Sequence, residues 1–228
     1  QCDLFKHIQN QPSLRTFVAV ITFNYDLACD YALQMAGLTP RYGLEDSHAD
    51  GLYLLKLHGS LNWASCSKCS TIFPWHLYKY LGEYSWRNIL MAREPLRLSL
   101  ASRIGQLIHC DAPVVKQPVL VPPTWNKTEY HTPISKVWAR AAWELREAEN
   151  IYVIAYSLPT SDAFFRYLYA LGTAGSVPLK RFWVFDPDET GTVENRYRSM
   201  LGPGALNRFM FYGYQFAQAV GIIKTHHQ

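Results

Sequence analysis

The sequence lacks the features that mark several large classes of protein. It has no G-x-G-x-x-G stretch and no Walker-type loop, which disfavours a standard hydride-transferring dehydrogenase and a phosphate-loop enzyme. Its longest apolar stretches are of strand length, well below the roughly 20 residues of a membrane-spanning helix, so we expect no membrane association. The 22 Lys and Arg residues are scattered and the net charge is only +4, so there is no direct nucleic-acid signal.

Cysteine is also scarce, and its count is odd. The 228 residues contain five cysteines, and their spacing does not resemble the disulfide framework of a secreted protein. We therefore expect a reduced, cytoplasmic setting. The hydrophobic fraction of 49% is ordinary for a globular protein, and the length suits one α/β domain with an insertion, or one large and one small domain.

Two apolar runs that end in polar residues carry most of the functional information. Residues 17–26 read FVAVITFNYD, and residues 52–63 read LYLLKLHGSLNW. Neither run alternates polar and apolar residues, so we predict two strands that are buried on both faces, as in a parallel sheet. Open sheets of this kind bind ligands beyond the carboxyl ends of their strands. We therefore expect Asn24, Asp26 and His58 to face one crevice.

The rest of the chain alternates between strand and helix patterns, apart from one interruption. Segment 61–117 breaks the rhythm with a CSKC sequence and many aromatic residues, and we predict an inserted small module there. The alternation predicts an α/β fold in which residues 1–60 and 118–228 form a doubly wound, parallel Rossmann-like sheet. The predicted strands are 16–22, 52–57, 118–121, 151–155 and 181–185; the predicted helices are 27–36, 86–91, 135–149, 162–171 and 192–200; a last short strand and helix fall within 208–220.

Several short motifs are informative as an ordered set. TFNYD at 22–26 resembles the T-x-N-x-D motif of sirtuins, and KLHGS at 56–60 resembles their catalytic histidine-glycine segment. The C-x-x-C pair at 66–69 follows directly, where sirtuins place their zinc module. The later matches are PVLVPPT at 118–124, similar to the return from that module, IAYSLP at 154–159, similar to the GYSLP segment of bacterial sirtuin-like domains, and FDPD at 185–188, where the family reads the adenosine end of its cofactor.

This resemblance implies an enzyme that takes NAD as its substrate and cleaves the bond between nicotinamide and ribose. Such a bond breaks through an oxocarbenium-like state, as in glycoside hydrolysis. Asn24 carries an amide that can hold a ribose hydroxyl or a water molecule. His58 can act as a general base, because imidazole titrates near neutrality. Asp26 either orders this pair or caps the helix that follows.

The remaining cofactor-binding residues are assigned on the same resemblance. Thr22 and Phe23 belong to the first motif, Gly59 lets the backbone approach a ligand, and Ser60 hydrogen-bonds that ligand. Ser157 and Asp186 are expected to contact phosphate or adenosine hydroxyls. The alternative is that these loops are polar because they supply turns and caps, with His58 a buried histidine bonded to a backbone carbonyl.

The sequence departs from the family pattern at the phosphate-binding loop. Residues 1–16 contain no glycine, although glycines are needed where backbone amides close on a pyrophosphate. The chain begins at Gln1 without an initiator Met, so we expect this loop to lie upstream, in a larger protein with other domains or subunits. Otherwise phosphate binding is rebuilt or lost.

The second departure concerns zinc. A structural zinc site needs four ligands, commonly from two C-x-x-C pairs. Cys66 and Cys69 make one such pair, whereas the second half of the segment offers only Cys110, with His109 beside it. The expected set is therefore Cys66, Cys69, Cys110 and His109, and the alternative is a degenerate module in which Cys66 and Cys69 remain free thiols.

Three activities are compatible with these motifs. We favour hydrolysis of NAD to nicotinamide and ADP-ribose, because bacterial sirtuin-like domains with TFNYD and GYSLP segments often resemble the NADase branch that serves antiviral defence. The first alternative is an NAD-dependent lysine deacylase, in which the acyl oxygen attacks the ribose. The second is a non-catalytic module that binds NAD or ADP-ribose.

Overall fold

The computed structural model describes most of the chain, and the account below is confined to that part. The described residues are 2–11, 14, 17–44, 50–75, 107–115, 117–121, 128–160, 165–166, 168–169 and 177–226. The predicted helix over 86–91 lies outside them. Only four residues of the predicted helix 162–171 fall inside, and Phe165, Arg166, Leu168 and Tyr169 are all helical.

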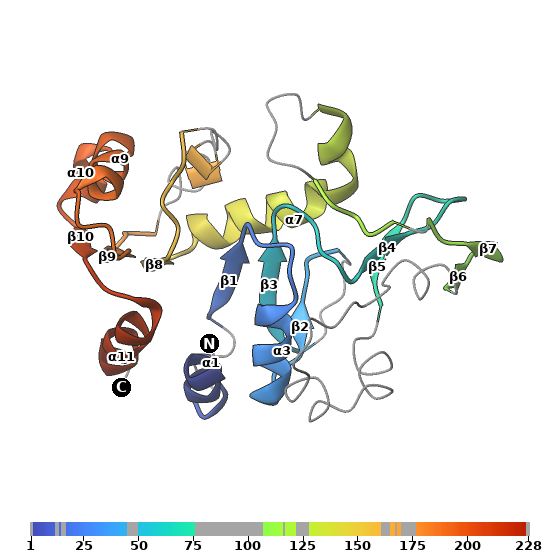
Figure 1. Cartoon of the computed structure of the whole chain (residues 1–228), viewed down its shortest axis with the longest axis horizontal. Coiled ribbons are helices and arrows are strands. Elements are labelled where there is room, and N and C mark those ends of the chain that lie inside the picture. Colours follow the sequence, from blue (N-terminus) through green and yellow to red (C-terminus); the bar gives the residue numbers. More distant parts are fainter. Residues whose placement is uncertain are drawn as a thin grey trace, which may run out of the picture.

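The chain has an α/β, Rossmann-like fold of parallel strands and helices (Figure 1). Strands β1 (Ala19–Thr22), β3 (Leu52–Lys56) and β2 (Pro40–Arg41) pair in the order β1-β3-β2, and every pairing is parallel. Strands β8 (Asn150–Ile154), β9 (Arg181–Phe185) and β10 (Phe209–Tyr212) form a second parallel sheet in the order β10-β9-β8. The described parallel strands thus pair as two sheets of three, where the sequence predicts one.

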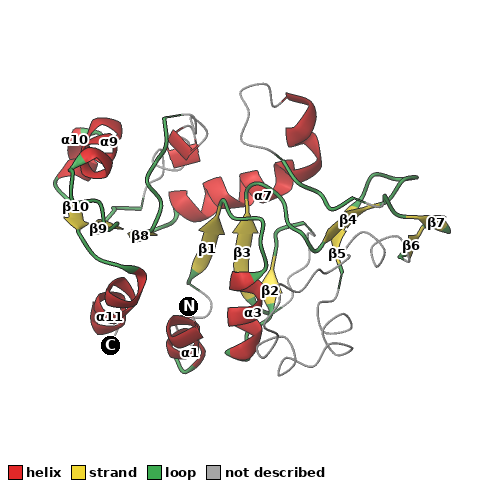
Figure 2. Cartoon of the chain, viewed as in Figure 1, coloured by secondary structure: helices red, strands yellow, loops and turns green. Residues whose placement is uncertain are grey.

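The central strand β3 is buried on both faces, as its apolar run predicts, whereas β1, predicted to be buried in the same way, is half-buried along its length. Leu54 and Leu55 are adjacent on β3, and successive strand residues point to opposite faces, yet both are 0% exposed. Helices α1 (Cys2–Gln9), α3 (Ala28–Met35) and α7 (Thr128–Arg146) contribute Phe5, Leu33 and Val137 to the same core (Figure 2).

The end of α3 follows from its sequence. Gly37 has φ of +77°, a conformation that glycine adopts without a Cβ penalty. The Gly37 amide donates to the Gln34 carbonyl and the Leu38 amide to the Leu33 carbonyl, each at 2.9 Å. These two bonds form a Schellman motif, which satisfies carbonyls at the helix end. The helix therefore stops where the glycine predicts.

The segment between the sheets contains two short antiparallel hairpins. Strands β4 (Trp63–Ser65) and β5 (Ile72–Pro74) make one, and β6 (Ile108–His109) and β7 (Ala112–Pro113) make the other. The chain returns beside the first hairpin, because the Val119 amide donates to the Trp63 carbonyl at 3.0 Å. None of these strands is long enough to show a periodicity, so the sequence did not predict them.

Other elements show where the sequence predictions were right and wrong. Helix α9 (Thr192–Met200) has the predicted bounds, and α11 (Phe216–His226) is the predicted last helix, while α1 and α10 (Pro203–Leu206) were not predicted. The predicted strand at 118–121 is wrong: it forms one isolated antiparallel bridge, between Leu120 and Gly59. None of the described helices is long and apolar enough to cross a membrane.

Candidate active site and candidate metal centre

An aromatic cluster gathers the carboxyl ends of β1, β3 and β8. The Phe23 ring lies edge-on to His58, with ring centroids 5.5 Å apart, and stacks on Tyr156 at 4.6 Å and an interplanar angle of 9°. Phe165 packs edge-on against both Phe23 and Tyr156, at 5.9 Å and 5.5 Å. The segments that follow β1, β3 and β8 therefore meet at one place, although β8 belongs to the other sheet.

His58 is buried at this meeting point, with 4% of its surface exposed. Its Nδ1 lies 2.9 Å from the Val121 carbonyl oxygen. A carbonyl oxygen can only accept a hydrogen bond, so Nδ1 carries the proton and Nε2 is the basic nitrogen of the neutral ring. The carbonyl-bonded histidine of the structural alternative is present, and it fixes the tautomer that a general base acting through Nε2 requires.

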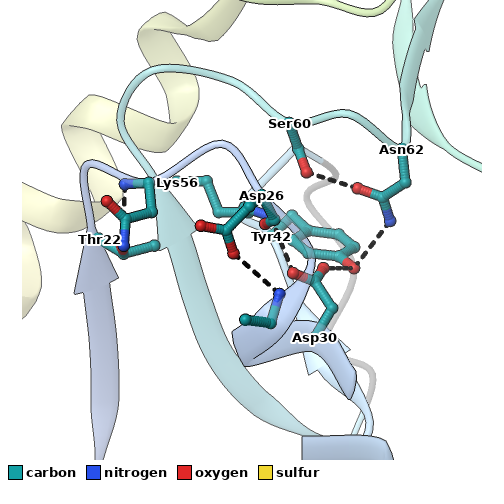
Figure 3. Close-up of polar contacts among 9 residues, drawn as sticks. Thr22, Asp26, Asp30, Tyr42, Lys56, Ser60 and Asn62 are labelled. Carbon is teal, nitrogen blue, oxygen red and sulfur yellow. Dashed lines mark hydrogen bonds and ion pairs between the residues drawn. The ribbon is translucent and has the colours of Figure 1, made fainter. Parts of the chain in front are cut away.

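The turn after β1 holds Asn24 and Asp26. Asn24 is exposed, and its backbone N–H donates to Thr22 Oγ1 at 3.0 Å. Asp26 Oδ1 accepts the Ala28 amide at 2.9 Å, so this carboxylate caps the start of α3 (Figure 3). Asp26 thus takes the capping role that the sequence left open, and the Thr22 hydroxyl is occupied in the turn.

Gly59 and Ser60 serve the protein interior in this structure. Gly59 has φ of +78°, and a Cβ there would lie 2.1 Å from the Val119 carbonyl oxygen. Ser60 is 0% exposed, and its hydroxyl donates to Asn62 Oδ1 at 2.6 Å. The sequence analysis assigned both residues to the ligand. In the structure, Gly59 leaves room for the backbone of Val119, and Ser60 bonds the buried side chain of Asn62.

Ser157 and Asp186 follow β8 and β9 of the second sheet. Ser157 is exposed, and its carbonyl accepts a hydrogen bond from Arg196 at 3.1 Å. Asp186 is buried, and its Oδ1 accepts the Asp188 amide at 3.0 Å. Asp188 in turn accepts the Val193 amide at the start of α9; hydrogen bonds from Thr190 and Val193 lower the pKa of Asp188.

A buried ion pair beside these loops was missed by the sequence reasoning. Lys56 Nζ lies 2.8 Å from Asp30 Oδ2, and the two side chains are 1% and 0% exposed. Lys56 Nζ also donates to the carbonyl oxygen of Asp26 (Figure 3). The partners are 26 residues apart, so no local spacing connects them. The one available signal is a lysine within an otherwise apolar strand.

The ion pair continues into a chain of hydrogen bonds through uncharged side chains. The Tyr42 hydroxyl donates to Asp30 Oδ1 at 2.6 Å, and Asn62 Nδ2 donates to the Tyr42 oxygen at 3.1 Å. Burial, followed by the nearby Asp30 carboxylate, raises the pKa of Tyr42 far above its ordinary value. Tyr42 therefore stays protonated and remains a donor. With Ser60 bonded to Asn62, the chain runs from Asp30 to the turn that follows His58.

The four residues predicted to bind zinc come together at the two hairpins. One ligand atom from each of Cys66, Cys69, His109 and Cys110 lies within 4.8 Å of all the others. Cys69 Sγ is 3.5 Å from His109 Nδ1 and 3.7 Å from Cys110 Sγ. Ligand atoms around a tetrahedral zinc ion lie about 3.8 Å apart for a Zn–S bond of about 2.3 Å. The set can therefore hold zinc, with three sulfurs and one nitrogen.

Local backbone geometry prepares these ligands. The Lys68 amide donates to Cys66 Sγ at 3.4 Å, and Cys110 has φ of +53°, which turns the chain between β6 and β7. Hydrogen bonding to Thr71 lowers the pKa of the Cys69 thiol to about 6, while pairing with Cys69 raises the pKa of Cys110. A thiolate is the form that ligates metal, so Cys69 is suited to this role.

Fold and site together define an α/β, Rossmann-like domain with a buried histidine at the end of β3 and a Cys₃His cluster. No protein-family model and no curated protein matches the chain. Similar solved structures are sirtuins. They include Sir2Tm with a propionylated peptide, which is 13% identical over 98% of this chain and 70% of that one, with a TM-score of 0.43. Another is Sir2 with a p53 peptide and NAD⁺, which is 13% identical over 98% of this chain and 69% of that one, with a TM-score of 0.43. A third belongs to work on the mechanism and regulation of Sir2 enzymes, and is 15% identical over 99% of this chain and 68% of that one, with a TM-score of 0.48.

Proposed function

We propose that this domain consumes NAD by cleaving the nicotinamide–ribose bond, and that it hydrolyses NAD to nicotinamide and ADP-ribose. The observation that carries the proposal is His58, buried at the end of β3 with its Nδ1 proton committed to the Val121 carbonyl. That commitment leaves Nε2 as the base. Exposed Asn24 follows the neighbouring strand β1, so an amide and a base belong to adjacent strand ends.

In the proposed reaction the bond between ribose C1′ and the nicotinamide nitrogen breaks, and nicotinamide leaves with the bonding electrons. The ribose passes through an oxocarbenium-like state. Water held by the Asn24 amide adds to C1′ and gives its proton to His58 Nε2. A general base in this position contributes about 10²- to 10⁴-fold to the rate. The products are nicotinamide and ADP-ribose, and His58 returns its proton to solvent.

The rest of NAD would lie along the second sheet. Ser157 and Asp186 follow β8 and β9, and we assign them to the phosphate and adenosine hydroxyls. Phe23, stacked on Tyr156, links this region to His58 and offers an aromatic surface to the substrate. Thr22 holds the turn that presents Asn24, because its hydroxyl oxygen accepts a hydrogen bond from the backbone N–H of Asn24.

The metal cluster has a structural part in this proposal. We assign residues 1–60 and 118–228 to the NAD-binding domain and 61–117 to an inserted module that zinc holds together through Cys66, Cys69, His109 and Cys110. The resemblance of TFNYD and IAYSLP to bacterial sirtuin-like hydrolases supports a cytoplasmic role in antiviral defence, as part of a larger assembly.

Nicotinamide release from NAD, measured with and without an acetyl-lysine peptide, tests the activity. We expect release without peptide, together with free ADP-ribose as the second product. Release that strictly requires the peptide would identify a deacylase in place of a hydrolase. Calorimetric binding of NAD or ADP-ribose with no release under either condition would identify a non-catalytic binding module.

A further inference from the structure

We propose that the buried Lys56–Asp30 pair positions the Asn24 loop, defined as residues 23–27, relative to His58. Lys56 ends β3 and stands two residues before His58. Asp30 lies in the first turn of α3, directly after the loop. What the loop does in catalysis rests on the proposed function, whereas the link between the pair and the loop rests on contacts alone.

Lys56 connects the end of β3, which precedes His58, to the segment that follows β1 and contains Asn24. Its Nζ donates to the carbonyl oxygen of Asp26, inside the Asn24 loop, and pairs with Asp30 Oδ2 at 2.8 Å (Figure 3). One ammonium group thus holds a backbone atom of the loop and a side chain of the following helix. The loop has a further backbone bond, in which the Leu61 amide donates to the Tyr25 carbonyl at 3.0 Å.

Burial makes this arrangement specific. A buried charge is costly unless it is paired and its hydrogen-bonding capacity is used, so the ammonium is held to positions where its acceptors are present. Asp30 accepts Lys56 on one oxygen and Tyr42 on the other, so neither oxygen can shift without losing a partner. The carboxylate also lies near the amino end of α3, where the helix dipole favours negative charge.

The same carboxylate is connected to the turn after His58. Tyr42 and Asn62 carry the hydrogen-bond chain from Asp30 to Ser60. Asp30 is therefore linked to the Asn24 loop through Lys56, and to the turn after His58 through Tyr42, Asn62 and Ser60. His58 has its own anchor in the Val121 carbonyl. Loss of the Lys56 bonds to Asp26 and Asp30 should therefore move the Asn24 loop and leave His58 in place.

The test uses the double variant Lys56→Met/Asp30→Asn. It removes both charges together, so no unpaired charge stays in the core, and the side-chain amide introduced at position 30 still offers an oxygen to the Tyr42 hydroxyl. The variant lacks the Lys56 bond to the Asp26 carbonyl. Lys180→Met is the control, because Lys180 pairs with Glu149 at 2.7 Å on the surface, where both side chains are about half exposed.

We expect faster hydrogen exchange at amides 23–28 of the double variant, with protection retained at 58–60. We also expect kcat for nicotinamide release to fall about a hundredfold, as for other displaced catalytic groups. KM for NAD should stay near the wild-type value, because Ser157 and Asp186 follow strands of the other sheet. A folded double variant with wild-type exchange at 23–28 and wild-type kcat would overturn the proposal.

Two further outcomes are separable. If the wild-type chain releases no nicotinamide, the proposed function fails, and the exchange comparison alone decides whether the pair positions the loop. If the double variant does not fold, ¹⁵N NMR of the wild-type lysine ammonium groups decides. Proton exchange that is slower at Lys56 Nζ than at Lys180 Nζ supports the hydrogen bonds from Lys56 to Asp26 and Asp30. Equally fast exchange at both lysines overturns the proposal.

Discussion

At the scale of single residues, Gly59 shows how the close approach of another backbone segment requires a glycine next to the proposed base. Its φ of +78° lies in the left-handed region, and a side chain there would meet the Val119 carbonyl at 2.1 Å. This close approach allows the Ser60 amide to bond the same carbonyl at 3.0 Å and the Val121 amide to bond the His58 carbonyl at 2.9 Å. Gly59 therefore keeps the Val119–Val121 segment against His58.

Gly59→Ala should destabilise the protein by about 3 kcal/mol, because the new methyl group meets backbone in a conformation that already disfavours it. Chemical denaturation followed by tryptophan fluorescence measures this. Gly204→Ala is the control, since a Cβ there meets nothing within 4 Å, and its effect should be within about 0.5 kcal/mol. Equal effects from both variants would contradict the packing account.

The sequence could predict which residues follow neighbouring strands, and it could not predict buried polar partners. Asn24 and His58 were assigned to one strand edge because parallel strands end on the same side. Lys56 and Asp30 were missed, because they are 26 residues apart and only the three-dimensional structure brings them together. Ser60 was assigned to the ligand because its segment resembles the histidine-glycine segment of sirtuins, and in the structure its hydroxyl bonds Asn62 in the interior.

At the scale of elements, the two hairpins show how short strands can be held together. β4–β5 and β6–β7 have strands of three and two residues, and isolated hairpins of this size are marginal in water. Their ligand-bearing turns meet at the Cys₃His cluster. A zinc ion there would cross-link the two hairpins through its ligand bonds, in addition to the small hydrophobic cluster of Ala64, Trp75 and Val114.

The protein should contain one zinc ion per chain, measured by elemental analysis after gel filtration. Cys69→Ala should lose most of this zinc and unfold at a lower temperature, because it removes one of four ligands. Cys29→Ala is the control, since Cys29 lies in α3, outside the cluster, and should keep its metal. A zinc content that Cys69→Ala leaves unchanged would remove Cys69 from the site.

Element prediction succeeded where a local signal existed. Helix α9 was predicted with its observed bounds from its pattern, and β3 from a continuous apolar run. Segment 118–121 has the composition of a strand, but it makes an isolated bridge to Gly59. Its other backbone partners are Trp63 of β4 and the loop residues His58 and Ser60, so no continuous strand lies beside it. Helix α1 was not predicted because residues 1–16 are mostly polar, and the core partners of its apolar residues Leu4, Phe5 and Ile8 lie on other elements.

At the scale of the whole molecule, side-chain packing joins the two sheets. Phe23 and Leu145 each pack against the hydrophobic cluster of the first sheet and against that of the second. Phe23 follows β1 and contacts Tyr156, which follows β8. The proposed NAD site lies where these two halves meet, so its geometry depends on their contact.

Phe23→Ala should lower the free energy of unfolding by about 2 kcal/mol, since it removes an aromatic ring shared by both clusters. It should also separate the unfolding transitions seen by circular dichroism and by tryptophan fluorescence, because the halves lose part of their coupling. Phe17→Ala is the control: Phe17 is 85% exposed, and its loss should change stability by less than about 0.5 kcal/mol. Equal losses in both variants would contradict this coupling.

Nicotinamide release from NAD by the wild-type chain and by His58→Ala, without any peptide, tests the central claim most directly. The wild type should release nicotinamide, and His58→Ala should release it at least about a hundredfold more slowly, because the general base is lost. His226→Ala, at the end of α11, should match the wild type. Undiminished release by a folded His58→Ala variant would contradict the account.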